Sequence, residues 1–354
     1  MKPRRNRSRP DPHRPTRSRR KTLVLAGDIG GTKTELGIFR VSPRLDLALI
    51  REGVFPSRDS PGLEPILERF VGSEAGTFAA AAFAIAGPVL ENRVETTNLP
   101  WIVEGRELSR QLECPVRLLN DLEGTAIGAM HLPRSEIRSL QEGVDRLGNR
   151  AVIAAGTGLG QAVLFWDGRR HVAVATEGGH TDFGPRNTRQ EELFDFLKKG
   201  YPHHVSYERI VSGPGLVNIF NFLEQAKGVP VETEIRARMK TEDPAAVIGE
   251  AALANSSRIC GETVDLFASV YGAQSGNLAV TVMAIGGVYV GGGIVTKLLP
   301  RILSSGFIDA FRAKGRYAPL LTQIPVRIIL NPKAALLGAA RAAAEVAAAG
   351  EARR

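Results

Sequence analysis

Five side chains that could do chemistry lie in three short stretches of the sequence. LLND ends with Asn120 and Asp121, an amide and a carboxylate that follow a predicted buried strand, where α/β folds present reactive groups. TEGGH contains Glu177 and His180, and the two glycines between them let the backbone approach a small ligand. SYERIVSGPGL places Glu208 before a predicted apolar strand and a turn that begins a helix. Carboxylates and amides accept hydrogen bonds from hydroxyl groups, so together these residues suit a polyhydroxylated substrate.

Each of these residues also has a plainer interpretation. Asp121 could cap a helix that begins at Leu122, because aspartate is common at helix starts. Glu177 and His180 could bind a metal, although no second cluster of histidine or cysteine completes a site. Glu208 could be an ordinary surface charge. One shared site accounts for all of these residues, whereas each plainer interpretation covers only one or two.

A glycine-rich turn near the start of the chain indicates a phosphate site of a particular kind. The stretch GDIGGTKTEL spans residues 27–36 and follows the apolar run 23–26. A P-loop would need a second glycine five residues after Gly27, where Thr32 stands, and a helix directly afterwards. Residues 32–41 instead alternate like a strand, which predicts that the glycines form the tip of a β-hairpin. Backbone amides at such a tip could turn toward a phosphate.

Two further glycine stretches fit the same chemistry. GTGLG at residues 156–160 again lies between a predicted apolar strand and an alternating strand. AIGGVYVGGGI at residues 284–294 is predicted as a strand that leads into three consecutive glycines and then a helix, which suits nucleotide contact. Alone, each turn could be an ordinary hairpin, and the triplet could serve only close helix packing. The occurrence of the two turns in matching contexts favours the phosphate interpretation.

The elements that must position these residues follow one order twice. The first part is predicted to contain strands at 22–26, 33–41, 46–55, 79–86 and 116–119, and helices at 61–71, 104–113 and from 122. The second part is predicted to contain strands at 151–155, 161–166, 171–175, 284–290 and 325–330, and helices at 189–199, 213–226, 255–280, from 294 and from 334. Three antiparallel strands followed by alternating helices and strands, occurring twice, predict a duplicated α/β fold with a cleft between its halves. The two glycine turns would then face each other across that cleft.

The positive charge of the chain is confined to one end. The 354 residues carry 46 Lys and Arg against 37 Asp and Glu. Residues 1–21 hold ten of the basic residues and one acidic residue, which leaves 36 of each in residues 22–354. The segment 1–21 is too polar to pack and is predicted to be a disordered basic tail. Because this segment has no interleaved aromatic residues, it is not expected to serve a dedicated nucleic-acid role.

The cysteine count and the hydropathy of the chain indicate the cellular compartment in which the protein is expected. Cys114 and Cys260 are the two cysteines of the sequence, which excludes a disulfide framework and favours a reducing cytoplasm. No secretory signal is predicted, because the basic start leads to only a few apolar residues. Residues 266–296 lack charge, but seven glycines and several polar residues indicate a buried helix end, a core strand and a glycine loop rather than a membrane span.

Seven stretches carry a resemblance to the bacterial glucokinase family, in the order and spacing of that family: GDIGGTKTELG, LLNDLEGTA, AAGTGLGQA, TEGGHTDF, SYERIVSGPGL, AIGGVYVGGGI and KGRYAPLLTQIPVRII. The resemblance runs from about residue 23 to about residue 340. It implies a duplicated α/β fold of the actin-like ATPase (ribonuclease H-like) type, with two domains and a nucleotide held in the cleft between them. It also implies ATP-dependent phosphorylation of glucose at the 6-hydroxyl, which feeds glycolysis. The tail departs from the family pattern.

The resemblance assigns roles to particular residues. The catalytic aspartate is implied at Asp121, and sugar contacts are implied at Asn120, Glu177, His180 and Glu208. Phosphate contacts are implied at Gly27, Asp28, Ile29, Gly30, Gly31 and Thr32, and at Thr157 and Gly158, with the adenosine side near Gly291, Gly292 and Gly293. A carboxylate must take the proton of the attacking hydroxyl, and we expect Asp121 to do so. We further expect ATP and Mg²⁺ as cofactors, with Asp28 orienting the ion through water.

The expected organisation has three parts. Residues 22–119 and 333–354 are predicted to form a small domain, and residues 120–332 a large one, behind the tail of residues 1–21. Glucose and ATP are the expected partners, with a homodimer as an open possibility and without membrane attachment. Two alternatives stay open: a kinase of this fold that acts on another hexose or an N-acyl amino sugar or uses polyphosphate, and a non-catalytic sugar sensor or actin-like filament ATPase.

Overall fold

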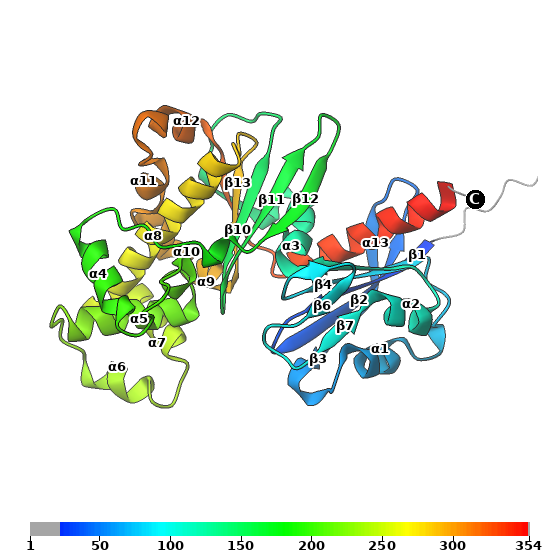
Figure 1. Cartoon of the computed structure of the whole chain (residues 1–354), viewed down its shortest axis with the longest axis horizontal. Coiled ribbons are helices and arrows are strands. Elements are labelled where there is room, and N and C mark those ends of the chain that lie inside the picture. The colour runs from blue at the N-terminus through cyan, green and yellow to red at the C-terminus, as the bar shows by residue number, and fades with distance from the viewer. Residues whose placement is uncertain (1–21, 353–354) are drawn as a thin grey trace, which may run out of the picture.

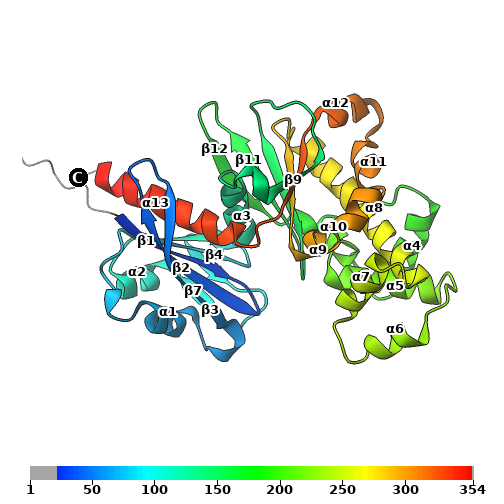
Figure 2. The ribbon, with the colours of Figure 1, turned by 180° about the vertical axis from the view of Figure 1, so that it is seen from behind.

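The computed structural model describes residues 22–352, which form two α/β halves joined at their centre (Figures 1 and 2). The basic segment 1–21, predicted to be disordered, lies outside the described residues. One half is built on a five-stranded sheet and the other on a six-stranded sheet, and a three-stranded sheet is added to the first half. Each of the two large sheets has a cluster of buried hydrophobic residues on both of its faces.

The first half has the strand order β3–β2–β1–β4–β8. The strands β1, β2 and β3 are antiparallel, and β4 and β8 continue parallel to β1. The strands are β1 (Thr22–Ile29), β2 (Lys33–Val41), β3 (Leu47–Pro56), β4 (Ala80–Ile85) and β8 (Val116–Asn120). This half also contains α1 (Leu63–Val71), α2 (Gly105–Leu112) and the small sheet of β5 (Val89–Leu90), β6 (Arg93–Glu95) and β7 (Ile102–Glu104).

The second half repeats this order in β12–β11–β10–β13–β14 and adds β9 at the edge. Again three antiparallel strands are followed by two parallel ones, so the predicted duplication is confirmed. The strands are β9 (Ile137–Gln141), β10 (Arg150–Ala155), β11 (Leu159–Trp166), β12 (His171–Thr176), β13 (Val288–Gly291) and β14 (Val326–Ile329). Its helices are α3 (Asp121–Ala129), α4 (Thr188–Lys198), α5 (Gly213–Gln225), α6 (Thr233–Arg238), α7 (Pro244–Leu253), α8 (Arg258–Thr281), α9 (Gly293–Lys297), α10 (Leu299–Ser304), α11 (Phe307–Arg312) and α12 (Ala318–Gln323). The last helix, α13 (Ala334–Ala352), returns to the sheet of the first half.

Alternation along β1 places helices on both faces of the first sheet. Successive side chains of a strand point to opposite faces. Leu25 belongs to the core formed with α1 and α2, where it packs in one cluster with Leu67 and Leu108. Its neighbour Val24 belongs to the other face, which α13 covers with alanines such as Ala339. Because the side chains of α13 are small, this helix lies close to the sheet.

The second sheet is layered in the same way. Ile153 of β10 lies in the large core with Phe267 of α8, whereas its neighbour Val152 lies in a cluster with Leu122 and Ala126 of α3. The helix α3 thus covers the second sheet as α13 covers the first. In Figure 1, α3 and α13 meet between the two halves, and their contact is the most extensive between any two elements of residues 22–352.

The crossing of α3 and α13 depends on glycine. A Cβ atom at Gly128 of α3 would lie 1.9 Å from the carbonyl oxygen of Ala334, and one at Gly338 of α13 would lie 1.8 Å from the carbonyl oxygen of Gly124. No real side chain fits at such distances, so the two helices are in backbone contact. The halves are therefore linked by a close helix pair as well as by the chain.

Replacing Gly338 with alanine should destabilise the protein. Alanine normally stabilises a helix interior relative to glycine by up to about 1 kcal/mol, but here its methyl group would force α13 away from α3, at a cost of roughly 1–3 kcal/mol or more. Gly350→Ala in the same helix is the matched control, because a Cβ there meets no atom within 4 Å. Urea denaturation measures both variants. Equal free energies of unfolding in the two variants would show that the crossing tolerates a side chain.

Two sequence predictions differ from the structure, and several elements were not predicted. The predicted strand after Glu208 is wrong: a short 3₁₀ turn, Tyr207–Arg209, is followed by a tight connection to α5, and Ile210 and Val211 are buried in the core. Their apolar character reflects burial without a partner strand. The strand predicted at 284–290 begins only at Val288. The helices α6, α7 and α10 to α12 and the strand β9 were not predicted.

The uncharged stretch 266–296 has the predicted internal structure. It forms the end of α8, the buried strand β13 and the glycine turn into α9. Among the described residues, the structure contains no helix with the length and hydropathy needed to cross a membrane.

Candidate active site

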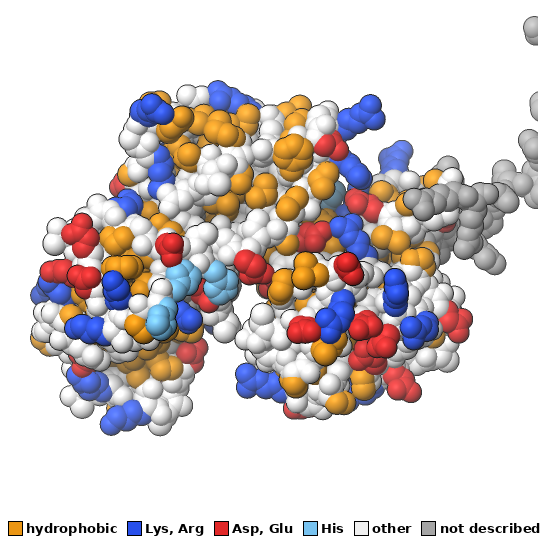
Figure 3. Space-filling model, viewed as in Figure 1, with side chains coloured by type: hydrophobic (Ala, Val, Ile, Leu, Met, Phe, Trp, Pro, Cys, Tyr) orange, Lys and Arg blue, Asp and Glu red, His pale blue; other side chains and the backbone are white. Residues whose placement is uncertain are grey.

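A cleft of about 830 Å³ lies between the two halves and collects most of the predicted site residues. Figure 3 shows the molecule hollowed between the halves, with histidine side chains gathered on the larger half beside the hollow. The predicted residues that line the cleft are Asp28, Gly30, Gly31, Asn120, Asp121, Thr157, Gly158, Glu177, His180, Glu208, Gly291, Gly292 and Gly293. The structure thus brings together segments that are up to 265 positions apart in the numbering, from Asp28 to Gly293.

Three predicted phosphate residues do not line this cleft. Gly27 lies within β1, where a Cβ would collide with the Phe83 and Leu36 side chains. The Ile29 side chain is buried in the core of the first half. Thr32 is exposed at the turn between β1 and β2. The phosphate role of these three residues stays a prediction.

The first glycine turn carries a half-buried carboxylate. The turn is closed by a hydrogen bond of 2.9 Å from the amide of Gly30 to the carbonyl oxygen of Lys33. Asp28 stands at the end of β1, directly opposite Glu35 of β2. Burial raises the pKa of the Asp28 carboxyl to about 7, and the charges of Asp121 and Glu35 add to this effect, whereas Lys33 opposes it. A carboxylate in this position favours a cation beside it.

The second glycine turn is held by Glu208. The amide of Leu159 donates a hydrogen bond of 2.9 Å to Oε2 of Glu208, and the amide of Gly156 bonds to the carbonyl oxygen of Gly158 at 2.9 Å. The Ser212 hydroxyl, which caps α5, donates to the carbonyl oxygen of Glu208 at 2.7 Å. Glu208 is therefore fixed at its backbone and at its side chain, which contradicts the interpretation as a free surface charge.

Asn120 and Asp121 lie where β8 passes into α3. Oδ1 of Asn120 caps the helix by accepting a hydrogen bond of 2.9 Å from the amide of Leu122, and Nδ2 of Asn120 donates to the carbonyl oxygen of Gly87 at 3.0 Å. Oδ1 of Asp121 accepts from the same amide at 2.9 Å. Oδ2 of Asp121 receives no hydrogen bond from residues 22–352. The capping interpretation therefore applies mainly to Asn120, and one oxygen of Asp121 is left for a ligand.

The surroundings of Asp121 tune its basicity. Burial raises the pKa of the Asp121 carboxyl to about 6, the hydrogen bond from Leu122 lowers it, and the charge of Glu177 raises it further. The Asp121 charge in turn contributes to the raised pKa of Asp28. Asp121 thus lies within electrostatic reach of the first glycine turn and of the Glu177 side of the cleft.

Glu177 and His180 project from a short turn after β12. Both are exposed, and the amide of His180 bonds to the carbonyl oxygen of Glu177 at 3.0 Å. A Cβ at Gly179 would lie 1.8 Å from the carbonyl oxygen of Leu159, so glycine is required for this turn to pack on the second glycine turn. Within residues 22–352, no three His, Cys, Asp or Glu side chains are close enough to hold a metal ion by themselves.

Sequence reasoning missed part of the cleft wall in the first half. Gly87 and Pro88 follow β4, and Thr97 and Asn98 lie between β6 and β7. A Cβ at Gly31 would lie 2.7 Å from the Cβ of Asn98, so this loop packs against the first glycine turn. The polar run ETTN between Val94 and Leu99 was the signal that could have indicated it.

The fold and the cleft define a class of protein. Two halves of like topology, each with a glycine hairpin turn at a shared cleft that holds carboxylates, form the actin-like ATPase fold of two-domain phosphotransferases. The family model of glucokinase matches residues 25–346, and the chain belongs to the glucokinase family. It is an ATP-dependent hexose kinase.

Relatives with known names agree with this assignment. The chain is 41% identical to a glucokinase of Trichormus variabilis, over 92% of this chain and 100% of that protein. A solved glucokinase from an Antarctic psychrotroph matches with a TM-score of 0.78 at 26% identity, covering 91% of this chain and 99% of that one. A ROK family glucokinase from Streptomyces griseus, solved with glucose and AMPPNP, shares the fold with a TM-score of 0.61 at 23% identity, covering 91% of this chain and 99% of that one.

Proposed function

We propose that the cleft phosphorylates glucose at its 6-hydroxyl and that Asp121 is the general base. The observation that carries this proposal is that Asp121 lines the same cleft as Asp28 and Glu177 and interacts electrostatically with both. A primary hydroxyl is a poor nucleophile at neutral pH, so its proton must pass to a carboxylate as it attacks the γ-phosphorus. Oδ2 of Asp121 is the atom that takes the proton, because Oδ1 is engaged with the amide of Leu122.

Four polar side chains are proposed to hold the sugar. Glu177, His180 and Glu208 line the cleft from the second half, and Asn120 joins them beside Asp121. The carboxylate and amide oxygens of Glu177, Glu208 and Asn120 suit hydroxyl donors, as does a ring nitrogen of His180. One N–H of the Asn120 amide is available, because the other donates to Gly87. Such groups hold the 6-hydroxyl near Asp121.

The two glycine turns are proposed to hold the phosphates of ATP from opposite sides. Their amides and the Thr157 hydroxyl line the cleft, and Gly291, Gly292 and Gly293 lie on the proposed adenosine side. Asp28 fits a Mg²⁺ site, because Mg²⁺ prefers carboxylate oxygens and usually keeps several waters. When bound there, Mg²⁺ would neutralise charge on the phosphates.

The experiment that tests the function is a coupled ADP-release assay with purified protein, Mg·ATP and a panel of hexoses and N-acyl amino sugars. Glucose is expected to give the highest kcat/KM. A higher value for another sugar would replace glucose as the substrate, and the absence of ADP release with every sugar would support the non-catalytic alternative.

Acid pH should reduce the activity through Asp121. The base must be ionised, and its pKa is raised to about 6, so kcat/KM for glucose should be half-maximal near pH 6. Below that pH it should fall about tenfold per pH unit, and above it the deprotonated carboxylate is fully available. A pH profile measured with saturating Mg·ATP checks this. An acid limb near pH 4 would mean that Asp121 titrates like an exposed carboxyl or is not the base.

Glucose alone should bring the halves together. A kinase that transfers phosphoryl groups to sugar must keep water from the same reaction, which favours closure triggered by the sugar. Small-angle scattering with saturating glucose should show a smaller radius of gyration than the free protein. Galactose at equal concentration is the control, and an unchanged profile with glucose would count against closure.

Three further properties belong to this proposal. The domain limits are proposed at 119/120 and 332/333, between β8 and α3 and just before α13, so that α3 belongs with the sheet it covers. A cytoplasmic location and a homodimer stay predictions.

A further inference from the structure

Two cationic side chains meet on one face of α8, outside the cleft. The Arg186 guanidinium donates to the carbonyl oxygen and the hydroxyl of Ser269, at 3.3 and 2.9 Å. The Lys314 ammonium donates to the carbonyl oxygen of Ala273 at 2.9 Å and to Oδ1 of Asn277 at 2.7 Å. Ser269 and Ala273 are four residues apart, so their backbone groups are about 6 Å apart along the helix axis. The two cations are thus anchored about one turn apart.

Neither cation has an acidic partner. No carboxylate of residues 22–352 forms an ion pair with Arg186 or Lys314, and the nearby carboxylates are committed elsewhere, Glu262 to Arg189 and Asp265 to Arg301. Burial lowers the pKa of Arg186. Burial and the charge of Arg186 together lower the pKa of Lys314 to about 8. Arg186 is exposed, whereas Lys314 is half-buried, and a half-buried ammonium beside a like charge is costly without a counter-charge.

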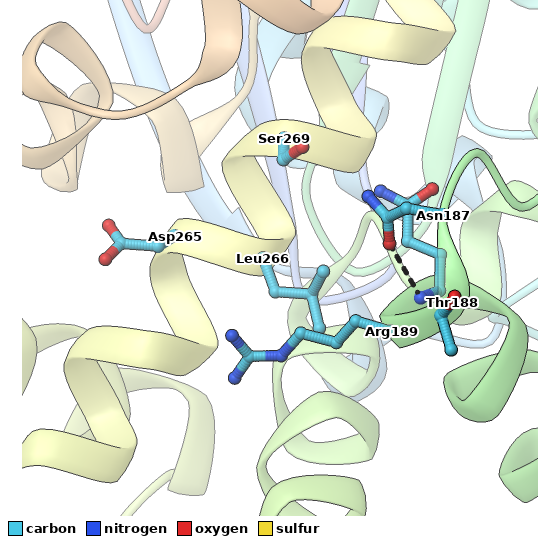
Figure 4. A pocket seen from close by; sticks show the side chains of 7 residues that line it. Asn187, Thr188, Arg189, Asp265, Leu266 and Ser269 are labelled. Carbon is cyan, nitrogen blue, oxygen red and sulfur yellow. Dashed lines mark hydrogen bonds between the residues drawn. The ribbon is translucent and has the colours of Figure 1, made fainter.

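An unpaired donor lies next to the backbone of Arg186. The Gln190 side chain is 1% exposed; its oxygen accepts from the amide of Arg186 at 3.0 Å, and its nitrogen Nε2 has no hydrogen-bond partner. Gln190 lines a pocket of about 460 Å³ between the start of α4 and α8. In Figure 4, Asn187 and Thr188 at the start of α4 lie across this pocket from Leu266 and Ser269 of α8. A buried donor without a partner indicates that an acceptor is missing.

We propose that Arg186 and Lys314 form a binding site for a small phosphate-bearing anion at the edge of this pocket. A guanidinium offers planar paired donors to phosphate oxygens, and an ammonium adds a point charge. The anion would neutralise both cations and give Nε2 of Gln190 the acceptor that it lacks.

The site is connected to the proposed sugar pocket. The Asn277 side chain, held by Lys314, donates through Nδ2 to the Tyr207 hydroxyl at 2.9 Å. The same hydroxyl accepts from the amide of Gly184, two residues before Arg186. Tyr207 directly precedes Glu208 in the chain. Anion binding should therefore change glucose affinity, a consequence that rests on the proposed role of Glu208.

The test uses inorganic phosphate and glycerol 2-phosphate as probes of free phosphate and of a phosphate monoester. Binding is measured by titration calorimetry of the full chain at constant ionic strength, with chloride as the reference anion. Arg186→Gln and Lys314→Met should each weaken binding of the preferred probe at least about tenfold, the effect of one charge-assisted contact. Methionine keeps the stem that packs over Gly276. Arg316→Gln, an exposed cation two residues further on, should bind as the wild type does.

Each outcome is decisive. Equal affinity in all variants would place the anion elsewhere, for example on the glycine turns, and would overturn the site, as would the absence of binding above chloride. If circular dichroism shows that Lys314→Met does not fold, the anion affinity of Arg186→Gln still tests the site, because Arg186 is exposed and its replacement should leave the fold intact. Titration of glucose with and without phosphate tests the coupling: a shift in the wild type that is lost in Tyr207→Phe supports it, and no shift overturns it. If the wild type did not bind glucose even without phosphate, that result would count against the proposed function and not against the anion site.

Discussion

Replacing Asp121 with asparagine is expected to lower kcat by about 10²- to 10⁴-fold, the usual contribution of a positioned general base. Asparagine has the same shape, and its oxygen can still accept the hydrogen bond that the amide of Leu122 now gives to Oδ1 of Asp121. The structure at the start of α3 is therefore kept, while the carboxylate that accepts the proton is lost. Removing the negative charge of Asp121 also removes one cause of the raised pKa of Asp28. Asp28 should therefore be at least as fully ionised in the variant as in the wild type, and its capacity to bind a cation should be kept.

The measurement pairs steady-state kinetics with glucose binding by calorimetry. Glucose affinity should stay within a fewfold of the wild type, because Asp121 acts on the proton and the other polar residues hold the sugar. Glu123→Gln is the matched control: it removes a carboxylate two residues away that is paired with Arg117 and does not line the cleft. A variant Asp121→Asn that keeps a third or more of wild-type turnover would remove this residue from the role of base.

The duplicated fold could be predicted because its signals are local. Along β1 and β2, an apolar run is followed by a glycine-rich turn and then by alternating apolar residues, a pattern that indicates a β-hairpin. The segment from β10 to β12 repeats this pattern. Asp121 follows a strand of the first sheet and Glu177 a strand of the second, and strand ends of α/β folds present reactive groups, so both residues could be predicted at the cleft between the halves.

What could not be predicted depends on contacts between distant segments. The sequence gives no sign that Gly338 touches Gly124, a pairing that exists only because α3 and α13 cross. Asn98 joins the cleft through a loop that packs on Gly31. Ile210 and Val211 were predicted as part of a strand because they are apolar. They are apolar because they are buried in the core, and they pair with no neighbouring strand.

Exchanging Glu177 or Glu208 for glutamine should raise the KM for glucose by about ten- to a hundredfold. A carboxylate accepts hydrogen bonds only, whereas an amide of the same size also donates, so one sugar hydroxyl loses a charge-assisted partner worth roughly 1.5–3 kcal/mol. The nucleotide is expected on the other side of the reacting hydroxyl. The KM for Mg·ATP should therefore change much less, and His180→Ala should act in the same direction as the two glutamine variants.

The two glutamates differ in a way that sharpens the test. Oε2 of Glu208 already accepts from the amide of Leu159 at the second glycine turn, and a Cβ at Gly158 would lie 2.5 Å from the same oxygen. A weakened contact there can loosen a turn proposed to hold phosphate, so Glu208→Gln should raise the KM for ATP more than Glu177→Gln does. Paired KM values for glucose and Mg·ATP, with circular dichroism as the fold control, measure both effects. If well-folded Glu177→Gln raised the ATP value and left the glucose value unchanged, this side of the cleft would hold the nucleotide, and the proposed sugar pocket would be wrongly placed.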